Sequence, residues 1–129
     1  MSKKLLLDSS VIIDFLRIKD KSESLFYKLA FENSKFLVSI VTHTELYSGK
    51  SIWENKIAYD ELGIIFENME IANLTREVSI DAGKIRAKYD LDLIDAIIAS
   101  TAVQLKIPLA TLNLKHFSRV KNLKILDIK

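Results

Sequence analysis

The chain has 129 residues, of which 49% are hydrophobic and 28% charged, and it contains only three glycines and one proline. This composition is typical of one folded domain with long regular elements, spanning residues 1–129, and it argues against a disordered chain. The absence of cysteine excludes disulfides, thiolate metal sites and a cysteine nucleophile. It also fits a reducing, cytoplasmic location.

The formal net charge is only +2, but the charge is unevenly distributed. Residues 1–95 carry 13 Lys and Arg against 16 Asp and Glu, whereas residues 96–129 carry six Lys and Arg against one Asp. From charge alone, a solvated lysine-rich surface is a better explanation of such a stretch than a phosphate-binding role. The apolar run near the N-terminus ends at Asp8 and is too short for a membrane span, so we expect no membrane association.

Short apolar runs alternate with helical patterns along the chain. In chain order we expect a strand at 3–8, helices at 9–17 and 21–32, a strand at 35–40, a helical region at 42–62 with a break near Gly49, a strand at 63–66, helices at 74–89 and 91–106, and strands at 108–112 and 123–128. This alternation predicts an α/β domain with three layers, in which helices flank a central, mainly parallel sheet of four to five strands. Continuous apolar strands favour burial on both faces of the sheet.

Several predicted boundaries carry capping residues. Ser9 or Ser10 can cap the first helix, and Thr42 followed by Glu45 matches a capping box. Asp92 fits the N-terminal cap of the helix at 91–106, and Pro108 follows the expected end of that helix.

Polar residues follow the strands at the edge where functional groups gather in parallel α/β sheets. Asp8 ends the first strand, Glu45 lies in the helix after the second, and Asp95 lies early in the helix before the strand at 108–112. Thr111 and Asn113 end that strand. Each residue alone has a structural explanation, as a turn residue or a cap, but their joint occurrence at one edge favours a single site.

Converging carboxylates repel one another, which raises at least one pKa unless a cation neutralises them. Carboxylate oxygens without cysteine or a histidine pair suit a hard ion, Mg²⁺ or Mn²⁺. Such a site supports the attack of water on a phosphodiester, and Asp8 is the best candidate to bridge two ions if two are bound. His43 and His116 remain without a predicted role.

The segments LLLDSSVIIDFLR, SIVTHTELYSG and LIDAIIASTAVQLKIPLATLNLKHF, with the final LKIL, resemble the PIN-domain family, in particular the small VapC-type toxins of prokaryotic toxin–antitoxin systems. The resemblance covers nearly the whole chain in the same order. It implies a Mg²⁺- or Mn²⁺-dependent ribonuclease, a homodimer held inactive by a cognate antitoxin protein.

On this resemblance, the catalytic set is Asp8, Glu45, Asp95 and Asn113, and the three acids are the metal ligands. The family's fourth acid falls in the segment TLNLKHF, where this chain has Asn113, and His116 stands where related sequences often have Asp. Asn occurs in such patterns, but its neutral amide weakens the case for a second ion. Asp92 is an extra acid that can replace the missing charge. Ser9 and Thr111 match polar positions that orient water or phosphate. Lys115 belongs to a basic group expected to hold the RNA backbone, together with Lys106, Arg119, Lys121 and Lys124.

Three other classes of protein share parts of this pattern. A receiver-like signalling domain needs an acceptor Asp after the third strand, where GIIFEN offers Glu67, and a haloacid-dehalogenase phosphatase needs a second Asp where Ser10 stands. A catalytically weak PIN-like module that binds RNA or protein stays open because of Asn113.

Overall fold

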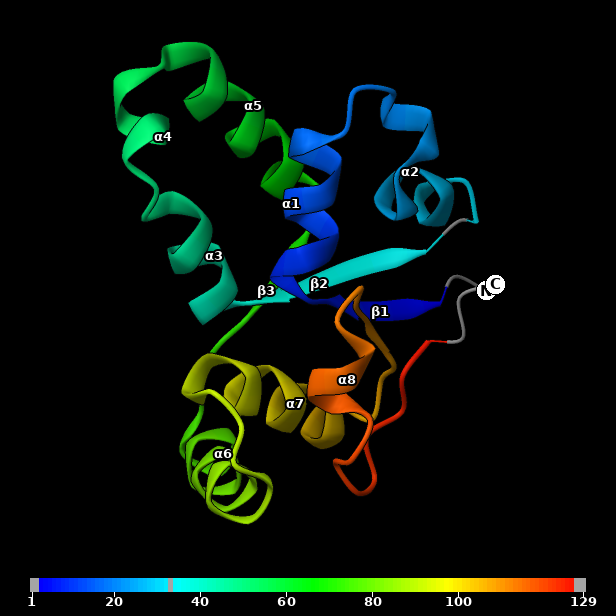
Figure 1. Ribbon diagram of the computed structural model, residues 1–129, viewed down its shortest axis with the longest axis vertical. Helices are drawn as coiled ribbons and strands as arrows, with labels where there is room; N and C mark the ends of the chain where they lie inside the picture. Colours follow the sequence, from blue (N-terminus) through cyan, green and yellow to red (C-terminus); the bar gives the residue numbers. More distant parts are fainter. Residues whose placement is uncertain (1–2, 33, 127–129) are drawn as a thin grey trace.

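The computed structural model describes residues 3–32 and 34–126, and within them four strands form one parallel sheet (Figure 1). The strands are β1 (Lys4–Leu7), β2 (Lys35–Ser39), β3 (Glu70–Ala72) and β4 (Leu109–Ala110). Their spatial order is β3-β2-β1-β4, and every pair of neighbours is parallel. The expected α/β fold with a central parallel sheet is therefore confirmed.

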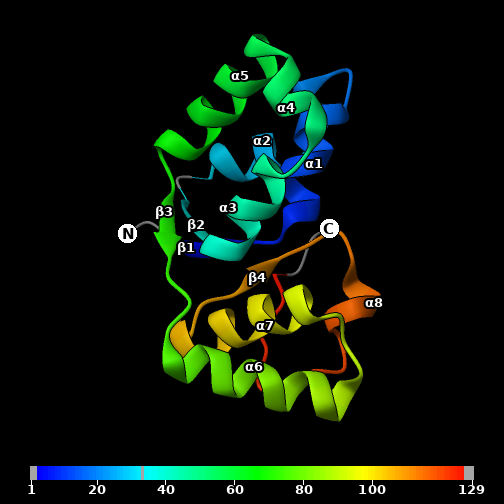
Figure 2. The ribbon, with the colours of Figure 1, turned by 90° about the vertical axis from the view of Figure 1, so that its left-hand side faces the viewer.

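Helices cover both faces of this sheet (Figures 1 and 2). One layer contains α1 (Ser9–Arg17), the 3₁₀ turn η1 (Lys21–Glu23), α2 (Leu25–Ala30), α3 (Ile40–Tyr47), α4 (Lys50–Glu54) and α5 (Lys56–Glu67). The other layer contains α6 (Arg76–Tyr89), α7 (Leu93–Leu105) and α8 (Leu114–Phe117). No helix within the described residues is long and apolar enough to cross a membrane.

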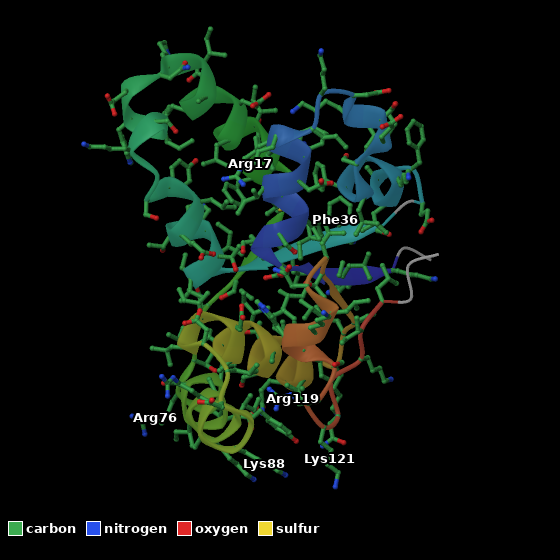
Figure 3. The ribbon with its side chains drawn as sticks, viewed as in Figure 1. Arg17, Phe36, Arg76, Lys88, Arg119 and Lys121 are labelled. Atoms are coloured by element: carbon green, nitrogen blue, oxygen red, sulfur yellow. The ribbon has the colours of Figure 1, made fainter. Side chains whose placement is uncertain are left out.

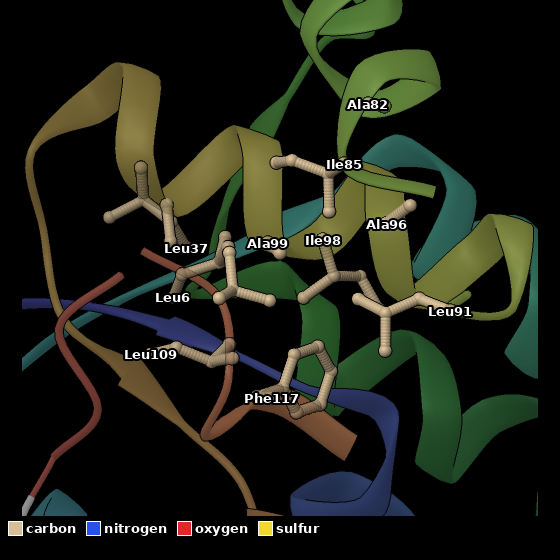
Figure 4. Close-up of a cluster of buried hydrophobic side chains, with 12 residues drawn as sticks. Leu6, Leu37, Ala82, Ile85, Leu91, Ala96, Ile98, Ala99, Leu109 and Phe117 are labelled. Atoms are coloured by element: carbon tan, nitrogen blue, oxygen red, sulfur yellow. The ribbon is translucent and has the colours of Figure 1, made fainter. Parts of the chain in front are cut away.

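Alternate residues of the strands enter two separate hydrophobic cores, because side chains along a strand point to opposite faces. Leu5 and Leu7 belong to the core under α1–α5. Leu6, Leu37 and Leu109 face α7 and Phe117 in the other core (Figure 4). Burial on both faces explains why the strand sequences are continuously apolar.

The strand predicted at 63–66 is wrong, because these residues lie within α5. Leu62 and Phe66 are both buried, whereas Ile64 is exposed. This four-residue spacing of buried side chains is that of a helix. The third strand instead lies at Glu70–Ala72, and the predicted region 42–62 divides into α3, α4 and the first part of α5.

Two of the predicted helix caps are also wrong. The N-cap of α1 is Asp8, whose side chain makes no capping bond, and neither Ser9 nor Ser10 occupies that position. Ser39 caps α3 by accepting a hydrogen bond from the backbone N–H of Val41 at 3.2 Å. Thr42 is consequently an interior residue of α3, and the capping box with Glu45 does not form.

At the C-terminal side, Asp92 is the N-cap of α7 as predicted, although its side chain makes no capping bond. The helix ends at Leu105, one residue before the left-handed Lys106. In the described part of the predicted strand 123–128, an isolated parallel bridge joins Leu109 and Ile125, so no regular strand forms there. Residues 127 and 128 lie outside the described residues.

Candidate active site

The fold brings four distant chain segments to the carboxyl edge of the sheet (Figure 1). Asp8 directly follows β1, which lies between β2 and β4. Thr111 follows β4, Glu45 lies on α3 directly after β2, and Asp95 lies in the first turn of α7. The parallel topology therefore places the predicted polar residues at a common edge.

Asp8 is held in one orientation by two hydroxyl groups. Its side chain is buried, with the residue 2% exposed. Its Oδ2 accepts hydrogen bonds of 2.7 Å from Ser10 Oγ and 2.7 Å from Thr111 Oγ1. Its backbone N–H donates to the carbonyl of Ala110 at 2.9 Å. The carboxylate is thus fixed between β1 and β4.

The same hydroxyl groups fix the chain after β4. Ser10 Oγ accepts from the backbone N–H of Leu112 at 3.0 Å, and Thr111 Oγ1 accepts from that of Asn113 at 2.9 Å. Ser10 was not among the predicted site residues. The available signal was its position two residues after Asp8, a spacing at which a hydroxyl can bond locally to a carboxylate.

Asp95 contacts His116, which the sequence left without a role. His116 Nδ1 lies 3.1 Å from Asp95 Oδ2, and the two side chains are 56% and 19% exposed, respectively. Burial raises the pKa of Asp95 above its ordinary value, and the charge of Asp8 adds to this rise. His116 opposes the shift through its charge and its hydrogen bond, while Asp92 raises the pKa further. This histidine reaches Asp95 because of the short helix α8, which the sequence did not predict.

The pKa of Glu45 is affected by the same group of acids. Its pKa is raised, first by loss of water around the carboxyl group, while a hydrogen bond with the Ser9 side chain acts in the opposite direction. The charges of Asp8, Asp95 and Asp92 each raise the pKa of Glu45 as well. The residue as a whole remains exposed to solvent. The three predicted acids therefore interact electrostatically, and Asp92 is close enough to act on two of them.

The side chains of Asn113 and Lys115 make no polar contact with these acids in the described part of the chain. Both are exposed, and no hydrogen bond or ion pair joins their side chains to the acids within the described residues. Asn113 is the N-cap of α8, and its backbone N–H, not its amide, contacts Thr111. Nothing in these contacts supports a catalytic role for the Asn113 side chain.

The donor set is one of carboxylate oxygens, but it does not form a closed cage in this conformation. Among residues 3–32 and 34–126, no three His, Cys, Asp or Glu side chains converge closely enough to hold a metal ion together. Two salt bridges occur in this part of the chain, Lys56–Asp60 and His116–Asp95, so neither Asp8 nor Glu45 pairs there with a Lys or Arg. Oxygen ligands of this type suit Mg²⁺ or Mn²⁺.

The sequence model of the PIN domain matches residues 5–123. The chain belongs to the PIN-domain family. This PIN domain is 34% identical to "Ribonuclease VapC1" of Methanocaldococcus jannaschii over 96% of this chain and 88% of that protein.

Solved structures with the same fold include VapBC2 from Rickettsia felis bound to a DNA fragment from its promoter. That match has a TM-score of 0.79 and 19% identity, and it covers 98% of this chain and 99% of the other. VapBC-1 from nontypeable Haemophilus influenzae matches with a TM-score of 0.78 and 20% identity, covering 96% and 97% of the two chains. Both matches show that this PIN domain has the fold of VapC-type proteins.

Proposed function

We propose that this protein is a Mg²⁺- or Mn²⁺-dependent endoribonuclease and the toxin of a VapBC-type toxin–antitoxin pair. The observation that carries the proposal is the gathering of acids at the carboxyl edge of the sheet: burial raises the pKa values of Glu45 and Asp95, and the charge of Asp8 raises both further. Such repulsion is costly unless a cation balances it. RNA as the substrate is supported by the similarity to Ribonuclease VapC1.

The residues present fit a hard divalent cation. Asp8 and Asp95 would be direct ligands, with Glu45 as the third acid of the set, and the added positive charge would relieve their repulsion. When bound, the ion lowers the pKa of a coordinated water and stabilises the charge that builds on the phosphoryl group.

The other polar residues of the candidate site would have separate roles in catalysis and binding. Ser10 and Thr111 hold the Asp8 carboxylate in place through Oδ2. Glu45 combines a raised pKa with access to solvent, which suits a group that accepts a proton from the attacking water. Ser9 would orient Glu45, and the exposed ammonium of Lys115 would bind a phosphate of the RNA.

A cognate antitoxin and a second copy of the chain are the proposed protein partners. The antitoxin is supported by the solved structures of the same fold, which are described as VapBC and other toxin–antitoxin assemblies. An apolar groove on the α1–α5 layer offers a surface for such a partner, because partner helices commonly bury an apolar face in a groove. Its lining includes Phe15, Phe26, Phe36, Ile57 and Ile64.

Cleavage of a mixed set of structured and unstructured short RNAs tests the catalytic proposal. Purified protein is assayed with Mg²⁺, Mn²⁺ or EDTA beside an Asp8→Asn, Asp95→Asn double variant. Loss of the ion or of its ligands removes several kcal/mol of transition-state stabilisation, so we expect cleavage to fall by at least about 10³-fold. Asp60→Asn is the matched control, because this exposed acid pairs only with Lys56.

Thermal melting gives a second measurement that does not depend on finding the substrate. An ion at 100 times its dissociation constant stabilises the folded protein by about 2.7 kcal/mol. Mg²⁺ or Mn²⁺ should therefore raise the melting temperature of the wild type and of Asp60→Asn, but not that of the double variant. Equal cleavage by the double variant and the wild type, or cleavage that persists in EDTA, would exclude the proposed mechanism.

A catalytically weak PIN-like module that binds RNA or protein is the second candidate. It is favoured by the neutral Asn113 at the position where the family has an acid, and by the lack of contact between its side chain and the acids. This candidate predicts RNA binding in EDTA with no cleavage under any metal condition. The same assays therefore separate the two functions.

A further inference from the structure

A polar cavity lies outside the acidic site, between the C-terminal half of α6 and the turn that follows α8. It has a volume of about 280 Å³, and its lining includes Lys84, Lys88, Tyr89, Lys121 and Asn122. We call it the Tyr89 cavity. Lys88, Arg119 and Lys121 appear together at the lower edge of the molecule, on the side of α6–α8 (Figure 3).

Tyr89 organises the cations around this cavity. Its hydroxyl oxygen accepts a hydrogen bond from the backbone N–H of Lys121 at 3.1 Å, and its carbonyl accepts one from Arg119 Nη2 at 3.0 Å. Lys88 Nζ lies 5.4 Å from the centre of the tyrosine ring. Tyr89 thus contacts Lys88 through its ring, Arg119 through its backbone carbonyl and the backbone of Lys121 through its hydroxyl.

The charge of the cavity is positive. Lys84, Lys88 and Lys121 are exposed, and neither of the two salt bridges in the described part of the chain involves them. Asp81 is the one acid in the cavity lining, and its Oδ2 accepts a 2.8 Å hydrogen bond from the buried Ser100. Asp90, the C-cap of α6, is the next acid in the chain. Lysine ammonium groups act as point charges that bind phosphate, so an anion is the expected ligand.

The cavity is connected to the acidic site through α8. His116 contacts Asp95, and three residues later Arg119 contacts Tyr89. Three residues span at most about 11 Å even when fully extended. One short segment of the chain thus contacts both Asp95 and Tyr89.

We propose that the Tyr89 cavity, together with Arg119, is a subsite for the phosphodiester backbone of single-stranded RNA, a few nucleotides away from the bond that is cleaved. The identity of the ligand rests on the proposed ribonuclease function. Contacts to backbone phosphate hold a strand without reading its bases. The subsite consequently adds affinity and register for long substrates, but no sequence preference.

The test uses a Lys84→Gln, Lys88→Gln, Lys121→Gln variant. Its matched control is Lys19→Gln, Lys28→Gln, Lys50→Gln, which removes the same charge from exposed positions in the α1–α5 layer. Both variants are first compared with the wild type by thermal melting. If the cavity variant fails to fold, Lys88→Gln and Lys121→Gln are measured separately.

Binding is followed by fluorescence anisotropy in EDTA over a range of salt concentrations, with single-stranded RNAs of about 4 and about 16 nucleotides, the range of common site sizes. For the long RNA, the slope of log affinity against log salt should fall by about 0.7 for each lost phosphate contact, or about 2 for three. The short RNA should lose little affinity. If the cavity variant and the control give the same slopes for the long RNA, the inference is wrong.

Two outcomes separate this inference from the proposed function. If the wild type cleaves RNA and the cavity variant binds and cleaves long RNA as the control does, the subsite is wrong and the ribonuclease stands. If the wild type cleaves nothing but the cavity variant loses affinity for long RNA, the ribonuclease fails and the subsite stands. Loss of binding to polyglutamate without loss of RNA binding would assign the cavity to an acidic protein partner and overturn the inference.

Discussion

The two layers of helices contribute different groups to the same edge of the sheet. Residues 9–67, which include the α1–α5 layer, carry seven Lys and Arg against nine Asp and Glu, whereas residues 76–124, with α6–α8, carry nine against five. Glu45 comes from the first layer, and Asp95 and the Tyr89 cavity come from the second. Acids therefore reach the site from both sides, but the surplus of cations lies on one side only. An RNA strand is expected to leave the acids across α6–α8.

The acids of the candidate site also differ in how firmly they are held. Asp8, at the carboxyl end of the central strand β1, is buried and accepts two hydroxyl hydrogen bonds. Asp95 depends on one contact with His116, which lies on the four-residue helix α8. That helix is anchored by Phe117, a fully buried residue of the hydrophobic core that also contains Leu6, Leu37 and Leu109 (Figure 4). The position of the Asp95 carboxylate is consequently easier to disturb than that of the Asp8 carboxylate.

The largest expected effect comes from replacing one buried side chain in each layer. Phe117→Ala should lower the free energy of unfolding by about 3–5 kcal/mol, and Leu62→Ala by about 2–5 kcal/mol, because each leaves a cavity in its core. At a temperature where both variants remain folded, Phe117→Ala should also reduce RNA cleavage, since α8 carries His116. Urea unfolding and cleavage assays measure the two effects. An equal loss of cleavage in both variants would contradict the proposed role of α8.

Two buried threonines provide a sharper comparison, because the same substitution should have opposite effects. Thr111→Val removes a donor to Asp8 and an acceptor for Asn113, and leaving a buried carboxylate short of a partner costs about 1–3 kcal/mol. Thr42 Oγ1 is the one buried side-chain polar atom in the described residues without a hydrogen-bond partner. Thr42→Val should therefore raise the free energy of unfolding by about 1 kcal/mol.

Urea unfolding of both threonine variants and of Thr111→Ser gives the comparison. The serine variant keeps the hydroxyl, so it should recover most of the lost stability and of any lost cleavage activity. Destabilisation by Thr42→Val would mean that a bound water or ligand satisfies this hydroxyl in solution.

The sequence predicted the central strands and the long helices α1, α6 and α7 better than the short elements. Strands with continuous apolar runs, such as β1 and β2, were located to within a residue or two, because burial on both faces leaves a strong signal. The strand expected at 63–66 failed because a short apolar run is ambiguous between a strand and a buried helix. In α5 the long amphipathic pattern from Lys56 extends through that run.

The positions of the candidate site residues were predicted where the chain topology determines them. Asp8, Glu45, Asp95 and Thr111 could be found because parallel strands bring their carboxyl ends to one edge. Ser10 and His116 could not be found with the same rule. Their roles depend on a side-chain orientation in the first turn of α1 and on a four-residue helix too short to show a periodic pattern.

The free energy of unfolding of the metal-free protein should depend on pH because of the acid cluster. The pKa values of Glu45 and Asp95 lie above their ordinary values of 4.5 and 3.8. The folded state therefore binds protons more tightly than the unfolded state, so stability is highest below the ordinary values and falls as pH rises through the raised ones. Glu45→Gln should remove part of this fall.

Thermal melting in EDTA across this pH range measures the effect, and saturating Mg²⁺ should reverse it in the wild type. Glu61→Gln serves as the control, since this exposed acid lies on α5, away from the carboxyl edge of the sheet. A wild-type protein whose metal-free stability rises with pH over this range, relative to Glu45→Gln, would contradict the predicted repulsion.

The smallest expected effect concerns His116, which connects α8 to Asp95. Its charge and hydrogen bond lower the pKa of Asp95, so His116→Gln should raise that pKa further and shift the acid side of the pH–rate profile for RNA cleavage to higher pH. Because His116 is largely exposed, the free energy of unfolding should change by less than about 0.5 kcal/mol. His43→Gln is the control: the ring of this histidine packs at an angle against those of Tyr47 and Phe66, with ring centres 4.9 and 4.6 Å away. A shifted profile in the His116 variant alone would make Asp95 the group whose ionisation limits cleavage at low pH, whereas unchanged profiles in both variants would assign that limit to another acid.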